Sequence, residues 1–168
     1  MKHILAILCL CSRVAFGFDS EGWLEKRAVL DREAERLQTL YGQCVKALQT
    51  PAENLAVPIE TYPDGKVKAN LTAARAQYFI DEGVVWGEDV VVREYGPDGT
   101  PRAEVTAKNC VVDRSTKSGY VAGHAKVTYG KTIVEGDGIY FSFAEEFVKI
   151  LSNAVIESTD LKVEGVRL

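Results

Sequence analysis

Histidine, cysteine and proline are scarce in this chain, and it has no cluster of positive charge. Its 168 residues include two histidines, four cysteines and five prolines, and lysine and arginine are scattered. So few imidazoles argue against most zinc or iron sites and against Ser-His-Asp or Cys-His catalysis. A formal net charge of -4 without a basic tract argues against a surface that tracks nucleic-acid phosphates. We therefore expect no metal, no cofactor and no nucleic-acid partner.

The short motifs of enzymes are missing as well. Neither GxGxxG nor GxxxxGK[ST] occurs, so a nucleotide-binding loop is not indicated. His124 is expected to be a solvent-facing strand residue, and the Asp-Gly pairs at Asp64, Asp98 and Asp137 are typical of turns rather than of calcium loops. We expect a protein that is not an enzyme.

The composition predicts a folded chain with one core. Hydrophobic residues make up 46% and charged residues 26% of a length that suits a single domain. Cys44 and Cys110 are too few for a disulfide scaffold, so two buried thiols are expected, with a disulfide as the alternative.

Residues 1–17 have the pattern of a secretory signal peptide. A basic start is followed by an apolar run and by Ala15-Phe16-Gly17, whose small residues suit a signal peptidase. The alternative is an uncleaved anchor, but the apolar stretch contains Arg13 and is shorter than the roughly 20 residues that a spanning helix needs. We expect cleavage and export.

Residues 18–50 are expected to form one long amphipathic helix. Leu30, Ala34, Leu37, Tyr41 and Cys44 recur at steps of three and four, with charged residues between them. This stripe can pack on the core of the same domain, or it can serve as a coiled-coil or docking surface for a partner. Residues 51–65, which contain three prolines and end in Asp-Gly, are expected to be a linker.

From residue 66 to residue 168 the pattern is that of an all-β domain. β-branched and aromatic residues alternate with polar ones, and turn signals interrupt them at short intervals. Strands are expected at 66–80, 84–95, 102–113, 119–129, 132–143, 147–157 and 160–168. The fold class is therefore mainly β, an open β-jellyroll or β-roll of repeated antiparallel hairpins, preceded by one long helix.

A repeat runs through this β region. Residues 83–91 match residues 119–127 at a shift of 36, with both glycines of each copy aligned, and residues 148–156 form a weaker third copy. Repeated hairpins stack into a roll with one continuous core, and its open edge strands can accept another chain.

The second copy carries a resemblance. This copy resembles the OstA-like family of lipopolysaccharide-export proteins, which includes the periplasmic LptA and LptC components. The matching residues are Ala107 to Asp113, Gly119-Tyr120-Val121-Ala122-Gly123 through Val127, and the following residues 132–139. Residues 158–165 look like the last strands of the LptC type. The resemblance covers about residues 66–168.

This resemblance implies a periplasmic protein that shields the acyl chains of lipopolysaccharide in an apolar groove during export to the outer membrane. Its implied partners are lipopolysaccharide or a similar lipid, other export-bridge β-roll proteins paired edge to edge, and an inner-membrane transporter. Strand alternation supplies the candidate acyl-facing residues. They are Ile80, Val85, Val91, Val112, Val121, Ala125, Val127, Ile139, Phe141, Ile150, Ala154 and Ile156. The alternative function is an envelope scaffold that assembles through its helix and sheet edges.

Overall fold

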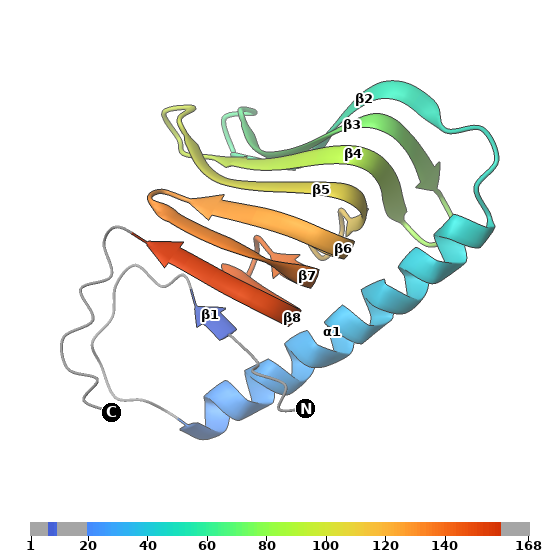
Figure 1. Cartoon of the computed structure of the whole chain (residues 1–168). Coiled ribbons are helices and arrows are strands. Elements are labelled where there is room, and N and C mark those ends of the chain that lie inside the picture. Colours follow the sequence, from blue (N-terminus) through green and yellow to red (C-terminus); the bar gives the residue numbers. More distant parts are fainter. Residues whose placement is uncertain (1–6, 10–19, 159–168) are drawn as a thin grey trace.

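One helix and one antiparallel sheet make up the computed structural model, which describes residues 7–9 and 20–158 (Figure 1). The helix is α1 (Ser20–Lys46), and the sheet order is β1-β8-β7-β6-β5-β4-β3-β2. The strands are β1 (Ile7–Cys9), β2 (Ala52–Thr61), β3 (Val67–Phe79), β4 (Val84–Tyr95), β5 (Pro101–Asp113), β6 (Ser118–Tyr129), β7 (Thr132–Ser142) and β8 (Phe147–Ser158). The expected fold class, a mainly β open sheet preceded by one helix, is confirmed. The expected strands from β3 to β8 agree with the structure to within a residue or so.

The expected linker at 51–65 is wrong, because most of it is strand β2. This strand pairs with β3 from Ala52 opposite Ala76 to Thr61 opposite Val67. Leu55, Val57 and Ile59 alternate toward the core of the sheet. A proline is tolerated at position 58 because β2 is the last strand of the sheet, where a missing N–H group costs no ladder hydrogen bond.

Two other expectations fall largely outside the described residues. The strand expected at 160–168 lies outside them entirely, as does most of the expected signal peptide. Of residues 1–17, only Ile7–Cys9 are described, and they pair with Phe147–Lys149 of β8.

The long strands bend near their middle, and this bend turns the sheet into an open roll. Left-handed backbone conformations occur at Asn54, Asp89, Gly123, Gly138 and Asn153, one in each of five strands. Register shifts lie at the same level between β5 and β6, between β6 and β7, and between β7 and β8. Bulges of this kind bend a strand and increase its twist. Each bent strand therefore contributes one half to each of two facing layers, and Figure 1 shows the sheet curling at β2, β3 and β4.

The inner core lies between the two halves of the roll. Buried residues from both halves of the strands form one apolar cluster, with Leu71, Val92 and Val105 on one side and Val112 and Ile139 on the other. Strand alternation gives each half one apolar inner face. The core therefore runs across the sheet from Ile59 in β2 to Ile150 in β8.

Helix α1 covers the outer face of one of these halves. Leu30, Ala34, Leu37 and Cys44 are buried against a second cluster that includes Trp86 and Tyr140. The helix contacts β4, β5 and β6, and it runs along one side of the sheet in Figure 1. The apolar stripe thus packs on the core of its own domain, as the first of the two sequence interpretations expects.

A polar group fastens α1 to the end of β5. The carboxylate of Asp113 accepts a hydrogen bond of 2.5 Å from Arg36 Nη2 and one of 2.8 Å from the Ser115 amide. Arg36 also donates to Glu33 Oε1 over 2.7 Å. Burial would raise the pKa of Asp113, but the hydrogen bonds from Ser115 and Arg36 outweigh burial and hold it below its ordinary value of 3.8.

Replacing Asp113 by asparagine is expected to lower the free energy of unfolding by about 2 kcal/mol at pH 7, because the substitution removes a charged acceptor. A lowered folded-state pKa means that this stabilisation is fully present above pH 3.8 and disappears as the pH falls through the folded value. The difference between wild type and Asp113→Asn should therefore shrink in acid. Urea unfolding at a series of pH values measures it, and a difference that does not change with pH would contradict the assignment.

Candidate functional site: a pocket at the mouth of the roll

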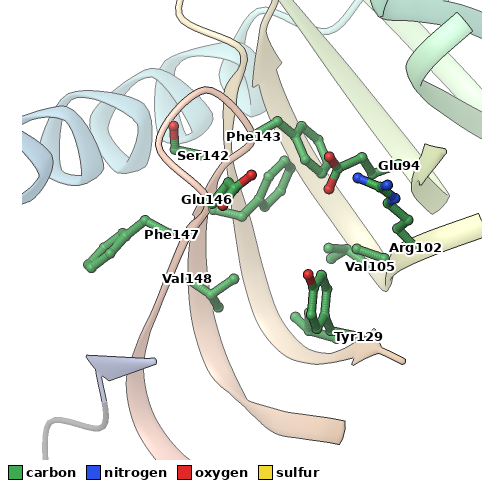
Figure 2. Close-up of a pocket in the computed structure, with 12 residues that line it drawn as sticks. Glu94, Arg102, Val105, Tyr129, Ser142, Phe143, Glu146, Phe147 and Val148 are labelled. Carbon is green, nitrogen blue, oxygen red and sulfur yellow. The ribbon is translucent and has the colours of Figure 1, made fainter. Parts of the chain in front are cut away.

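A small pocket with a cavity volume of about 70 Å³ lies between the two halves of the roll. Its walls come from the ends of β4, β5 and β6, and from the end of β7, the turn that follows it and the start of β8 (Figure 2). The apolar part of the lining consists of Ala103, Val105, Val127, Phe141, Phe143, Phe147 and Val148. The pocket is therefore an opening of the inner core rather than a depression on the outer surface.

The pocket exists because large and small side chains meet at this end of the core. The rings of Phe141 and Phe143 lie 5.3 Å apart, centre to centre, and form one wall. Ala103 and Val105 on β5, opposite them, are too small to fill the space between the layers. Gly119 pairs with Phe141 and leaves room for its ring.

Three charged side chains stand at the mouth: Glu94, Arg102 and Glu146. Figure 2 shows Glu94 and Arg102 on one side of the pocket and Glu146, carried by the β7–β8 turn, on the other. In the described part of the chain none of the three forms an ion pair, although the charges of Glu146 and Arg102 both act on the Glu94 carboxyl. Burial is the main reason that the pKa of Glu94 is raised, and the nearby negative charge of Glu146 adds to the increase.

Next to the pocket, two ion pairs connect the two halves of the roll. Lys117 Nζ, in the turn before β6, lies 2.7 Å from Glu60 Oε1 on β2, and Lys68 Nζ lies 3.2 Å from Glu60 Oε2. Burial would raise the pKa of Glu60, but the hydrogen bond from Lys117 and the nearby charge of Lys68 lower it. This pairing joins one half of the roll to the other at a distance of 57 residues in sequence.

Most of the predicted lining residues do share the inner face. Eight belong to the buried inner cluster: Val85, Val112, Val121, Ala125, Val127, Ile139, Phe141 and Ile150. Ala154 packs against this cluster, and Ile156 lies opposite Val134 on the same side of the sheet, with 37% of its surface exposed. Only Val127 and Phe141 reach the pocket itself.

Two of the predicted lining residues are placed elsewhere. Ile80 lies in the turn after β3 and is 78% exposed. Val91 lies on the outer face, because the bulge at Asp89 makes Val90 and Val92 the inward residues of β4. The repeat suggests that Val91 and Val127 are equivalent, but Gly123 has a positive φ and lies in the bend of β6, whereas Gly87 does not.

The pocket residues that sequence reasoning missed are Ala103, Val105, Tyr129, Ser142, Phe143, Phe147 and Val148, together with the three charges of the mouth. They lie at strand ends and in a turn, where alternation carries little information. Val105 belongs to the same strand as Val112, but a bulge between them reverses the faces.

Other chemistry finds little support in the described residues. They contain no group of three or more His, Cys, Asp or Glu side chains that could share a metal ion. Cys44 and Cys110 are free and buried, and burial raises their thiol pKa values to about 11 and about 12, so neither is an activated nucleophile. His124 is exposed, as expected, and lies 3.2 Å from Asp137 Oδ1.

Comparisons with known proteins attach no family to the chain: it matches no protein-family model and no curated protein. Within residues 7–9 and 20–158, no helix is long and apolar enough to cross a membrane.

Proposed function

We propose that this protein binds the acyl chains of a lipid and carries them through the periplasm, in the manner of the OstA-like lipopolysaccharide-export proteins that its sequence resembles. The observation that carries the proposal is the pocket between the two halves of the roll, which opens the apolar inner core to solvent. An interior open at one end can receive an apolar chain while the polar head stays in water.

The energetics of acyl-chain transfer suit such a site. Each methylene moved out of water contributes about 0.8 kcal/mol, so a chain of moderate length is held without covalent chemistry. The side chains deep in the pocket, Val105, Val127, Phe141 and Val148, are apolar. This function therefore requires no nucleophile and no metal.

Partners and location follow from the same proposal. A periplasmic protein of this kind would receive lipid from an inner-membrane transporter and pass it to other β-roll proteins paired with its sheet edges. The two ends of the sheet differ, since β2 carries Pro58 while β8 accepts the short strand β1. The alternative scaffold function loses one support, because the helix stripe is buried against its own sheet.

Replacing Ala103 by phenylalanine is expected to weaken chain capture at least tenfold, because the ring fills space that about two or more methylenes would occupy, at about 0.8 kcal/mol each. The measurement is the binding of a fluorescent fatty acid to the purified protein. Ala56→Phe is the matched control, since Ala56 is exposed on β2 and lies outside the pocket.

Both variants should keep the circular dichroism spectrum of the wild type. If Ala103→Phe is folded and still captures the probe as well as Ala56→Phe does, the pocket is not the binding site. Photocrosslinking in the living envelope from Val127, with exposed Lys126 as the outward control, then tests whether lipid reaches this pocket in the cell.

A further inference from the structure

The size of the pocket limits what can enter it. Its cavity volume is about 70 Å³, and a water-sized group needs about 10–15 Å³ on this measure, so the pocket holds about five methylene-sized groups. This is room for the end of one acyl chain. A lipid with several chains would need several such spaces.

The middle of the inner core is closely packed. Val112, Val121, Ile139 and Ile150 are almost completely buried and pack against one another in the inner cluster. Native interiors of this density leave few voids larger than a water molecule. The site therefore takes one chain at a time.

The charges at the mouth indicate the head group of that chain. Arg102 and Glu146 are both exposed. In the described part of the chain, neither side chain has an ion-pair partner. The neighbouring charges Glu60, Lys68 and Lys117 are already paired with one another. A cation and an anion left unpaired at one mouth are complementary to a head group that carries both signs of charge.

Glu94 and Tyr129 complete this mouth. Glu94 lies close enough to Arg102 for the guanidinium charge to act on its carboxyl, and burial is the main reason that the pKa of this carboxyl is raised. Tyr129 lines the same opening from the end of β6 and adds a phenolic hydroxyl. Arginine is well suited to phosphate, because its planar guanidinium donates two parallel hydrogen bonds.

Building on the proposed function, we infer that the pocket selects a zwitterionic single-chain phospholipid, with the phosphate at Arg102, the ammonium at Glu146 and the acyl chain among Val105, Val127 and Phe141. The site then distinguishes ligands by head group as well as by chain. Lysophosphatidylethanolamine is the simplest molecule with these features.

The test is a competition assay on the full chain, in which three probes with chains of equal length displace the fluorescent fatty acid. The probes are lysophosphatidylethanolamine, the anionic lysophosphatidylglycerol and a neutral alkyl alcohol. Wild type should bind the zwitterionic probe about fivefold more tightly than the anionic one, which is the effect of one partly exposed charge pair. Glu146→Gln should remove this preference.

Arg102→Gln should weaken both phospholipids about fivefold and leave the alcohol unchanged. Arg114→Gln, which removes an exposed arginine outside the pocket, is the matched control and should change none of the three affinities. Equal binding of all probes by wild type, Arg102→Gln and Glu146→Gln would overturn the head-group inference and leave chain capture intact. Failure of wild type to bind any probe, the alcohol included, would overturn the proposed function as well.

Discussion

Replacing Leu37 by alanine is expected to lower the free energy of unfolding by about 3 kcal/mol, within the range for removing a large buried side chain. Leu37 is completely buried between α1 and the outer face of the sheet, among Val84, Val111 and Tyr140. The substitution leaves a cavity that the helix and the strands can close only in part. Urea unfolding followed by circular dichroism measures the change.

Leu24→Ala is the matched control on the same helix. Leu24 is 57% exposed, so the same substitution there should change stability by less than about 0.5 kcal/mol. Equal effects of the two substitutions would mean that α1 does not pack on the sheet in solution. Binding of the fatty-acid probe to folded Leu37→Ala should persist, because α1 contributes no residue to the pocket.

The elements of this fold could be predicted because each carries a strong local signal. The stripe from Leu30 to Cys44 has a helical period, and it is the face that packs on the sheet. Alternation and Gly-containing turns located strands β3 to β8. Strand β2 was missed because its prolines and its position after the helix resemble a connection, whereas its pairing with β3 is a tertiary interaction that no local pattern shows.

The bend of the sheet is the main reason that the sequence did not place all of the lining residues correctly. Alternation assigns faces correctly only while the register is continuous, and the bulge in β4 shifts it by one residue. Val85 and Val121 were therefore placed correctly, whereas Val91, just beyond the bulge at Asp89, was not. Asp89 and Asn153 have a positive φ. Asp and Asn can adopt this conformation, but the residue type alone does not predict where they do so.

The pocket itself could not be predicted, because it forms where residues distant in sequence meet. Glu94 and Arg102 flank one turn, while Phe143 and Glu146 belong to another turn in the opposite half of the roll. Only the fold brings them together. Amino-acid composition does not show that charges of both signs meet at the mouth of this pocket.

Gly119 lies against the ring of Phe141, which lines the pocket. A β-carbon at this position would lie 2.7 Å from Phe141 Cε1 and closer still to Cζ, so Gly119→Ala must push the ring toward the pocket. We expect a loss of about 2 kcal/mol in the free energy of unfolding, as for other overpacked cores, together with weaker binding of the fatty-acid probe.

A shorter side chain at position 141 should relieve this clash. In the double variant Gly119→Ala/Phe141→Leu, the free energy of unfolding should fall by about 1 kcal/mol less than the sum of the two single effects. Gly42→Ala is the control, since nothing lies within 4 Å of its β-carbon position and alanine favours the helix, so it should stabilise the protein slightly. Strict additivity of the two substitutions would mean that the ring of Phe141 does not lie over Gly119, and the pocket wall would then have to be assigned to other residues.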